Sequence, residues 1–266
     1  MTTIKVYDGA EIACEVTGDG ESILLVPGLG GNASFWTEQI PLLAGSYRVI
    51  TYDHRGAGRS TMSRIRYSVE QMAEDALAVL DGLGIERAHL VGHSTGGAIG
   101  QVIALEKPKR LLSLVASSSW ASPDPYFTRL FQVRLQALER GVADYVRCGT
   151  LFQYSQDYID ENIHAIEAAE EATIARFPPV EIVASKIEAV MSFNRSRDLH
   201  RIQVPTLVNT ALDDLICPPR FSRELAHLIP KSVLSLMTQG AHFCPRSVPR
   251  QYFRNIQEFL KVNKIA

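Results

Sequence analysis

The sequence carries almost no net charge. Its 27 Lys and Arg residues nearly balance its 29 Asp and Glu residues over 266 positions, which leaves a net charge of −2. That balance argues against a nucleic-acid-binding protein and against a polybasic surface that binds membranes. Long apolar runs are missing as well, so the sequence predicts no membrane-spanning helix. Because 46% of the residues are hydrophobic and 21% are charged, we expect a folded chain rather than a disordered one.

Cysteine is scarce and scattered. Cys14, Cys148, Cys217 and Cys244 form no C-x-x-C pair, which argues against a zinc ribbon or a thioredoxin-type redox site. We therefore expect unpaired, reduced thiols, with no metal and no other cofactor. The N-terminal residues contain no apolar segment of the kind found in signal peptides, so we expect a soluble protein of the cytoplasm.

Signatures of nucleotide binding are also missing. A glycine-rich segment, Gly28-Leu29-Gly30-Gly31, follows an apolar run, but the pattern G-x-G-x-x-G fails at Ala33. The pattern G-x-x-x-x-G-K-[ST] does not occur. We therefore expect no nucleotide site in this protein.

The sequence does contain a regular alternation of short apolar runs and helix-like segments. Apolar runs too short for helices predict buried strands at residues 22–26, 48–52, 88–91, 111–116, 206–210 and 233–236. Two further runs, 4–6 and 12–16, flank Asp8-Gly9-Ala10 and predict a hairpin. Residues at helical spacing follow most of the strands, and Ser68 is positioned to cap one such helix together with Gln71. Strands that alternate with helices predict a mostly parallel sheet covered on both faces.

Between Trp120 and about His200 the alternation stops. This stretch contains only helix-like segments, at 127–140, 158–177 and 180–191. A long helical insertion in an α/β chain predicts a helical cap over the sheet. We therefore expect an α/β core formed by residues 1–119 and 201–266, with residues 120–200 as its cap.

The strongest functional signal is Gly92-His93-Ser94-Thr95-Gly96. This G-x-S-x-G motif follows the predicted strand 88–91 and opens a predicted helix, which is the context of a nucleophile elbow. Only small residues fit beside a turn this tight. The turn raises the Ser94 hydroxyl above the sheet and places it at a helix N-terminus, where N–H groups and the helix dipole favour negative charge. The motif predicts Ser94 as a catalytic nucleophile.

A serine hydroxyl is a poor nucleophile without a base. After an elbow serine, the acid and then the histidine are expected in that order along the chain. Asp213 and Asp214 follow the predicted strand 206–210, and His242 follows the predicted strand 233–236. Both loops lie where open parallel sheets bind ligands. We expect His242 to act as general base and then general acid, held by one of the two aspartates.

Acyl transfer also needs two backbone N–H groups aimed at the developing oxyanion. We expect one from Thr95, the residue after the nucleophile, and the other from Leu29. Leu29 is the better candidate in its loop because Gly28 and Gly30 on either side let its amide turn inward.

Three cap residues are candidates for substrate binding. Trp120 directly follows a predicted strand and suits either a pocket wall or a buried hinge position. Arg129 and Arg134 could hold a substrate carboxylate through paired hydrogen bonds, although their spacing does not place them on one helix face. In the core, Asp53 and Arg55 lie in a glycine-rich turn, and we expect them to pair with each other and brace the neighbouring loops.

Over essentially its whole length the chain resembles the α/β-hydrolase superfamily. The matching segments are Val-Pro-Gly-Leu-Gly-Gly, Asp-His-Arg-Gly-Ala-Gly-Arg-Ser, Gly-His-Ser-Thr-Gly, Asp-Asp-Leu-Ile-Cys-Pro and Gly-Ala-His. The resemblance implies the α/β-hydrolase fold, with a mostly parallel eight-stranded sheet, flanking helices and a helical cap. In this superfamily a proline typically follows the acid by four residues, and Pro218 therefore favours Asp214 over Asp213.

Within the superfamily the chain is most similar to the group of 3-oxoadipate enol-lactonases and aminoacrylate hydrolases. The cap segments Phe131-Gln132-Val133-Arg134 and Leu151-Phe152-Gln153-Tyr154 resemble the latter. The chain departs from the group in one loop, where Pro27-Gly28 replaces a frequent His-Gly. This change leaves the N–H of Leu29 in place but removes a polar neighbour.

Together these features predict a serine hydrolase acting on a small metabolite, with or without a carboxylate, through an acyl-enzyme. The bond is an ester, a lactone, an amide or an enamine-type C–N bond. A serine at the elbow argues against haloalkane dehalogenases and epoxide hydrolases, which resemble this fold but carry aspartate there. Three alternatives stay open, namely a C–C bond hydrolase of ring-cleavage products, a small-molecule receptor on the same scaffold, and a cofactor-free lyase or perhydrolase. A homodimer also stays open, whereas we expect no nucleic-acid or membrane partner.

Overall fold

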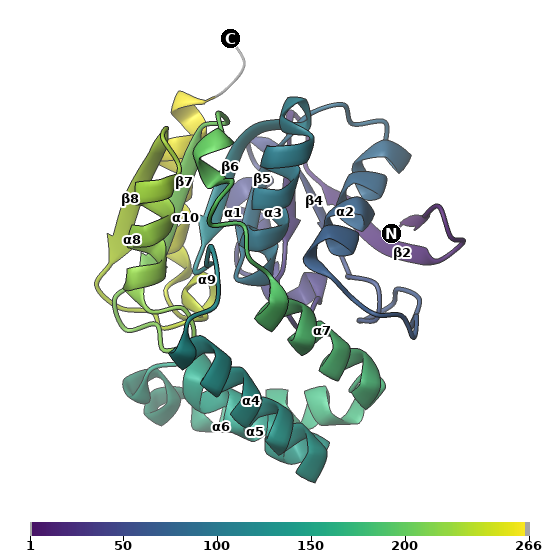
Figure 1. Ribbon diagram of the computed structural model, residues 1–266, viewed down its shortest axis with the longest axis vertical. Helices are drawn as coiled ribbons and strands as arrows, with labels where there is room; N and C mark the ends of the chain where they lie inside the picture. The colour runs from purple at the N-terminus through teal and green to yellow at the C-terminus, as the bar shows by residue number, and fades with distance from the viewer. Residues whose placement is uncertain (1, 264–266) are drawn as a thin grey trace.

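One eight-stranded sheet organises the protein, in a computed structural model that describes residues 2–263 (Figure 1). The strands are β1 (Thr2–Lys5), β2 (Glu11–Thr17), β3 (Glu21–Val26), β4 (Tyr47–Tyr52), β5 (Ala88–His93), β6 (Leu111–Ser117), β7 (Thr206–Ala211) and β8 (Ser232–Met237). The helices are α1 (Ile40–Leu43), α2 (Val69–Gly82), α3 (Thr95–Glu106), α4 (Pro125–Arg140), α5 (Val142–Gln153), α6 (Gln156–Ala175), α7 (Val180–Ser192), α8 (Pro219–Leu228), α9 (Cys244–Ser247) and α10 (Pro249–Val262).

The order of strands across the sheet is β1-β2-β4-β3-β5-β6-β7-β8. Only the pairs β1–β2 and β2–β4 are antiparallel, and the remaining pairs are parallel. Every residue of β5, β6 and β7 is buried, which is why these strands show as continuous apolar runs rather than as alternating ones. The predicted fold class, a mostly parallel eight-stranded sheet flanked by helices, is confirmed.

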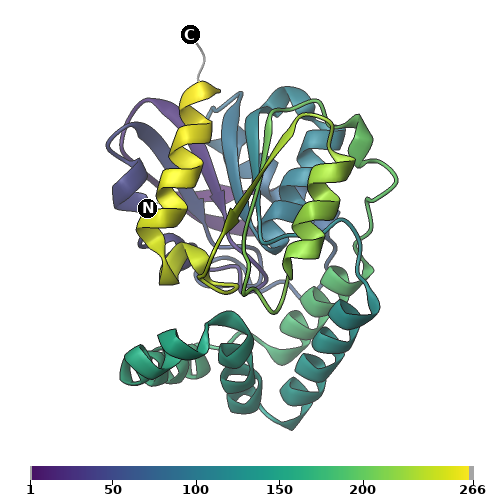
Figure 2. The same cartoon turned by 90° about the vertical axis from the view of Figure 1, so that its left-hand side faces the viewer.

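Helices cover both faces of the sheet (Figures 1 and 2). On one face α2, α3 and α8 pack through side chains that include Val79, Ile99 and Leu225. On the other face α1 and α10 pack through side chains that include Leu43 and Ile256. The helices thereby shield the central parallel strands β5, β6 and β7 from water on both sides, whereas the edge strand β8 is largely exposed.

Helices α4–α7 lie between β6 and β7 in the sequence and form a separate layer below the sheet in Figure 2. Three of these helices agree with the predicted segments to within two residues at each end. The fourth, α5, was not predicted. Its apolar face is weak, since only Tyr145, Gly149 and Thr150 are buried, and a glycine in mid-helix lowers helix propensity. Packing on α4 and α6 stabilises it instead.

The sheet order places a switch point between β3 and β5. The chain leaves β3 for β4 on one side and later returns to β5 on the other side of β3. Loops that follow two such strands diverge and leave a crevice at the carboxyl end of the sheet. The loop after β3 contains Leu29, and the turn after β5 contains Ser94, so the topology brings these two distant residues to one place.

Two features predicted from short sequence patterns are confirmed, namely the hairpin turn at Asp8-Gly9-Ala10 and the helix cap at Ser68. The Asp8 carboxylate accepts a hydrogen bond from the Ala10 N–H at 3.1 Å, and Gly9 takes a φ of 87° that suits a glycine. The Ser68 hydroxyl accepts a hydrogen bond from the Gln71 N–H at 3.1 Å and caps α2. These signals depend only on residues close in sequence.

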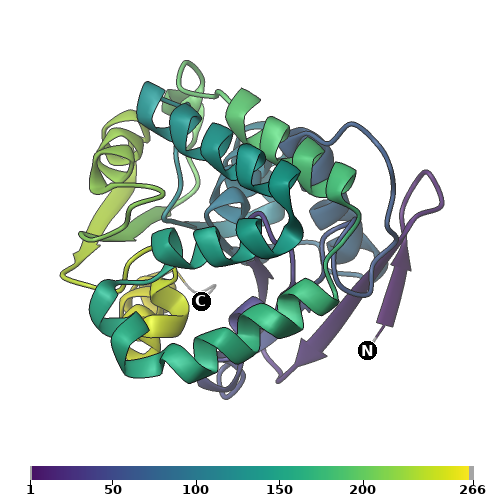
Figure 3. The same cartoon turned by 90° about the horizontal axis from the view of Figure 1, so that it is seen from below.

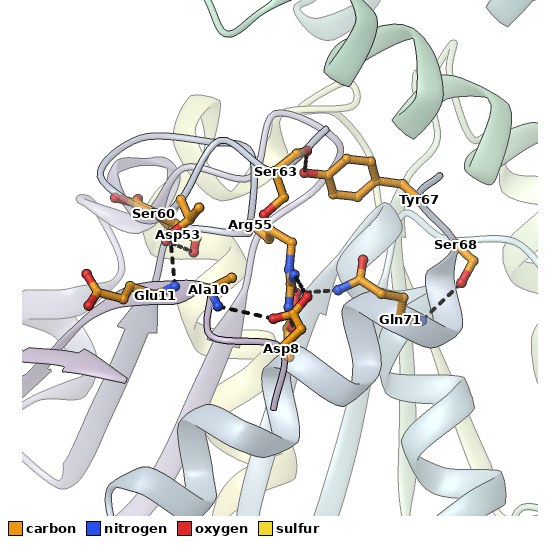
Figure 4. A network of polar contacts seen from close by, with 12 residues as sticks. Asp8, Ala10, Glu11, Asp53, Arg55, Ser60, Ser63, Tyr67, Ser68 and Gln71 are labelled. Carbon is orange, nitrogen blue, oxygen red and sulfur yellow. Dashed lines mark hydrogen bonds and ion pairs between the residues drawn. The ribbon is translucent and has the colours of Figure 1, made fainter. Parts of the chain in front are cut away.

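The expected pair of Asp53 and Arg55 was wrong (Figure 4). The Arg55 guanidinium is buried and binds both carboxylate oxygens of Asp75 at 2.8 and 3.0 Å, and it also pairs with Asp8. The Asp53 carboxylate instead accepts a hydrogen bond from the Ala33 N–H at 2.8 Å. A buried guanidinium needs several acceptors at once, and the fold supplies them from β1–β2 and α2 rather than from its sequence neighbours.

Candidate active site

Ser94 lies on a sharp turn between β5 and α3. Its backbone angles, φ 54° and ψ −116°, are unusual for a residue with a side chain. A Cβ added to Gly92 would lie 2.1 Å from the Gly96 carbonyl oxygen, and one added to Gly96 would lie 2.1 Å from the Val26 carbonyl oxygen. Both glycines of the motif are therefore required by close packing, and the turn holds the serine in its strained conformation.

Asp214 contacts His242 directly. The Nδ1 atom of His242 lies 3.0 and 2.9 Å from the two carboxylate oxygens of Asp214, and both side chains are almost fully buried. The N–H groups of Ile216 and Cys217 also donate to Asp214, at 2.9 and 2.8 Å. A carboxylate held in this way accepts a hydrogen bond from the Nδ1–H group of His242 and leaves Nε2 as the basic nitrogen.

Asp213 has a different task from its neighbour. Its carboxylate accepts hydrogen bonds from the N–H groups of Gly240 and Ala241, at 3.2 and 2.8 Å. Ala241 has a φ of 51°, which the two bonds help to hold. Asp213 therefore shapes the backbone just before His242, whereas Asp214 binds the imidazole itself.

The His242 ring lies beside the elbow. Its centroid is 4.9 Å from that of His93, the residue before Ser94. His93 is buried and stacks on Phe35 at 4.8 Å. Burial, with a smaller contribution from His242, lowers the pKa of His93 well below its usual value, so this ring stays neutral. A neutral neighbour does not repel positive charge that develops on His242.

The glycine-rich loop after β3 passes over Ser94. A Cβ added to Gly28 would lie 3.2 Å from the Ser94 Cβ. Thr95 is the first residue of α3, where N–H groups have no partner inside the helix. Within residues 2–263, no acceptor takes the N–H of Leu29 or of Thr95. Two free N–H groups thus flank the serine, one from each loop at the switch point.

The three predicted cap residues have different surroundings. Trp120 is fully buried, its ring packs on Phe127 at 4.8 Å, and its indole N–H has no partner in the described chain. Arg129 is exposed on α4. Arg134, on the same helix, is buried and donates a hydrogen bond to the Tyr145 hydroxyl at 2.9 Å.

An opening borders the acid loop. A cleft of about 540 Å³ lies between the α5–α6 turn and this loop, and its walls include Tyr154, Asp213 and Leu215. The Tyr154 ring also packs on Phe243, at 5.3 Å, directly after the catalytic candidate His242. The α5–α6 turn therefore lies beside both loops that follow β7 and β8, as Figure 3 shows from the side of the cap helices.

Two buried basic residues near the site were missed in the sequence. The Lys186 ammonium donates to the Gly56 carbonyl at 3.0 Å and lies 5.2 Å from the Tyr67 ring. Burial lowers the pKa of Lys186 to about 7. His54 is buried, and neither of its ring nitrogens has a hydrogen-bond partner among residues 2–263. Burial, followed by the Lys186 charge, lowers the pKa of His54 to about 3. A signal existed, because Lys186 lies at helical spacing among the apolar residues that α7 buries.

The buried Lys186 gives a pH-dependent stability. In the unfolded chain its pKa is near 10.5, so between pH 7 and 10 the unfolded state binds about one more proton than the folded state. Raising the pH therefore stabilises the wild type relative to Lys186→Met, by up to about 1.4 kcal/mol per pH unit. Urea unfolding of both proteins from pH 6 to 9.5 measures this difference. Lys231→Met, at an exposed lysine, is the control, and parallel curves for Lys186→Met and the wild type would contradict the buried titration.

Within the described residues, no helix is long and apolar enough to cross a membrane. In that same part of the chain, no group of three or more His, Cys, Asp and Glu side chains is placed to hold a metal ion.

Comparison with known proteins identifies the family. The sequence profile of the α/β hydrolase fold matches residues 21–244, a span that runs from β3 to the first residue of α9. The chain belongs to the α/β-hydrolase fold family. The motif residues, the strand order and the placement of Ser94, Asp214 and His242 at the carboxyl ends of strands all agree with this membership.

Relatives in the family cover most of the chain. A protein of Caulobacter sp. (strain K31), named "Putative carbamate hydrolase RutD", is 37% identical over 244 residues, 91% of each chain. A protein of the same name from Stutzerimonas stutzeri (strain A1501) is 40% identical over 226 residues, 84% of this chain and 85% of its own. These similarities make the present protein a hydrolase, and they agree with the predicted likeness to the enol-lactonase and aminoacrylate hydrolase group.

Solved structures in the α/β-hydrolase family superpose closely. The enol-lactonase of Burkholderia xenovorans LB400 superposes with a TM-score of 0.89 at 24% identity, over 98% of this chain and 100% of that one. A thermophilic esterase of Thermogutta terrifontis superposes with a TM-score of 0.88 at 27% identity, over 99% of both chains. The match to the enol-lactonase shows a shared fold. The match to the esterase shows the same fold in a second hydrolase, at higher sequence identity.

Proposed function

We propose that this protein is a serine hydrolase that cleaves an acyl bond of a small metabolite through a covalent acyl-enzyme. The observation that carries the proposal is the His242 imidazole, held at Nδ1 by the buried Asp214 and lying beside the turn that presents Ser94. A serine next to a base that is itself oriented by an acid is the arrangement that activates a hydroxyl.

The first half-reaction forms the acyl-enzyme. Nε2 of His242 takes the Ser94 proton as the oxygen attacks the substrate carbonyl, and Asp214 stabilises the resulting imidazolium without taking the proton. The N–H groups of Leu29 and Thr95 donate to the oxyanion. His242 then returns the proton to the leaving group, and the bond to the carbonyl carbon breaks.

The second half-reaction restores the enzyme. Water enters, gives a proton to His242 and attacks the acyl carbon. The tetrahedral intermediate collapses, His242 returns the proton to the Ser94 oxygen, and the acid product leaves. The buried positions of Asp214 and His242 strengthen these electrostatic interactions because little water screens them.

Several bond types suit this chemistry. Esters, lactones and amides are the candidates, and the names of the relatives add carbamates. An enamine-type C–N bond is not an acyl bond, so its hydrolysis would not pass through this acyl-enzyme. The lactonase and esterase among the structural neighbours support the ester and lactone classes. We rank esters and lactones first, since their leaving groups need the least assistance from His242.

Covalent labelling combined with a substrate panel tests the proposal. An alkyl fluorophosphonate should add one phosphonyl group to the wild type, and peptide mass spectrometry should place it on Ser94. Proton release in weak buffer over short esters, lactones, acylamides, carbamates and vinylogous diketo acids then identifies the bond class. Labelling elsewhere in the chain would contradict the assignment of the nucleophile. Turnover of the diketo acids alone would favour a C–C bond hydrolase, and labelling without turnover would favour a receptor.

A further inference from the structure

Strand β8 is an open edge of the sheet and pairs only with β7. Figure 2 views the protein from this side, with β8 between α10, in yellow, and α8, and no element of residues 2–263 lies in front of it. Three of its six residues are exposed apolar side chains, with exposed fractions of 58% for Val233, 37% for Leu234 and 36% for Leu236. The edge therefore offers both backbone hydrogen-bonding groups and apolar side chains to a further strand.

The opposite edge, β1, is protected in the ways that edge strands usually are. It has only four residues, it ends in the charged Lys5, and it buries its one apolar side chain, Ile4. Short strands and charged residues, lysine above all, keep sheet edges from pairing with other chains. The segment Ser232–Met237 that forms β8 contains no charged residue and no proline. Of the two edges, only β8 is therefore suited to pairing with another strand.

A second copy of the same chain fits this edge because β8 is self-complementary. A two-fold axis perpendicular to the sheet makes two β8 strands antiparallel, with opposed residues on the same face. With the axis through Ser235, Leu234 of each copy lies opposite Leu236 of the other, and Val233 likewise lies opposite Met237. Every exposed apolar residue of the strand then has an apolar partner. An axis through Leu234 would instead place Val233 and Leu236 against serines.

Helix α10 carries charges that fit the same symmetry. The Asn255 side chain donates a hydrogen bond to the Ser235 hydroxyl at 3.0 Å, so this turn of α10 lies level with the middle of β8. Arg254 and Glu258 are exposed one turn apart beside Asn255, and neither forms an ion pair within the described part of the chain. The axis at Ser235 makes the two α10 helices antiparallel neighbours. Arg254 of each copy then approaches Glu258 of the other, so the charges are complementary across the axis.

We propose that the protein forms a homodimer in which two β8 strands pair antiparallel about a two-fold axis at Ser235. The pairing joins the two eight-stranded sheets into one continuous sheet. Burial of the apolar side chains drives association, and the register is fixed because a slip of one residue would turn these side chains to the wrong faces. Each copy contains its own Ser94 and His242, so dimerisation and the proposed hydrolase activity can fail independently of each other.

Sedimentation equilibrium measures the oligomeric state. At about 50 µM chain the wild type should have the mass of two chains. Leu234→Lys places a charge against Leu236 of the other copy and should raise the dissociation constant of the dimer at least about 30-fold. Val180→Lys, at a similarly exposed apolar residue of the cap, is the control and should leave the mass unchanged. Far-UV circular dichroism checks that both variants are folded.

The wild type by itself can overturn the proposal. A mass of one chain at about 500 µM would do so, and it would leave the edge to a strand of a different protein. A dimer that Leu234→Lys leaves as tight as the wild type would also overturn it, because the interface would then lie elsewhere.

Exchange of charges on α10 tests the orientation of the two copies. Arg254→Glu and Glu258→Arg each bring like charges together across the axis and should each raise the dissociation constant about 3- to 10-fold. The double variant restores opposite charges and should return the constant to within about twofold of the wild type. Weakening that persists in the double variant would contradict the antiparallel arrangement of the α10 helices.

A cysteine on the axis tests the register. In Ser235→Cys the two thiols lie opposite each other, where the Cα atoms of an antiparallel pair are about 4.5–5.5 Å apart, a separation that a disulfide can span. Mild oxidation should therefore link the two chains. In the matched control Ser232→Cys, the two thiols lie about 20 Å apart and should not link. Equal cross-linking of both variants, or a dimer that Ser235→Cys cannot cross-link, would overturn the assignment of β8.

Discussion

Ser94→Ala is expected to lower kcat about 10⁵-fold on the best ester or lactone substrate. The substitution removes the attacking oxygen, and the remaining histidine, aspartate and N–H groups can only orient water. Substrate binding should be retained because the hydroxyl contributes little to it. The ratio of kcat between the wild type and Ser94→Ala is measured with a stopped-flow assay for the wild type and an assay over many hours for the variant.

A matched serine provides the control. Ser118 is buried, has a similar unusual φ of 47°, and lies at the end of β6, the strand next to β5. Ser118→Ala should keep kcat within about threefold, since its hydroxyl contacts Thr210, at 3.4 Å, and the Cys244 thiol. A comparable loss in both variants would mean that the backbone strain, and not the Ser94 hydroxyl, carries the activity. Unchanged activity in Ser94→Ala would refute the assignment of Ser94 as the nucleophile.

Asp214→Asn is expected to lower kcat about 10⁴-fold. An asparagine keeps the shape but can present an N–H to Nδ1 of His242, which favours the tautomer that blocks Nε2 as a base. It also removes the negative charge that stabilises the imidazolium. Initial rates of Asp214→Asn and the wild type, measured on the same substrate under the same conditions, give the ratio.

The adjacent aspartate is the natural control for this prediction. Asp213 binds only the N–H groups of Gly240 and Ala241, and an amide oxygen can replace one of these bonds. Asp213→Asn should therefore reduce kcat less than about tenfold and lower the free energy of unfolding by about 1–2 kcal/mol. If Asp213→Asn abolished activity and Asp214→Asn did not, the roles of the two aspartates would be reversed.

Much of the site was predictable because it depends on local residues. The clash that would follow from any side chain at Gly92 or Gly96 restricts the elbow to small residues, and that restriction is visible in the sequence as G-x-S-x-G. Strand ends are visible as the ends of apolar runs, so the positions of Asp214 and His242 after two strands followed as well. Parallel strands then bring their carboxyl ends to one edge.

The two predictions that failed, the partner of Arg55 and the number of cap helices, share one physical cause. Arg55 was assigned to Asp53, two residues away, but its partners Asp8 and Asp75 are brought to it by β1–β2 and by α2. Helix α5 carries too few buried apolar residues to show a periodic pattern, and contacts with α4 and α6 stabilise it. In each case the decisive interaction joins segments far apart in the chain, and no local pattern records it.

The sequence by itself determined the family and the sheet and indicated the candidate nucleophile and base, because each depends on the backbone geometry of a short segment. The tertiary structure decided what long-range packing controls. It placed Asp213, beside the favoured Asp214, on the N–H groups of Gly240 and Ala241, and it buried Arg134 while leaving Arg129 in solvent. Burial and charge pairing are properties of the assembled fold, since both depend on which helices and loops meet around a side chain.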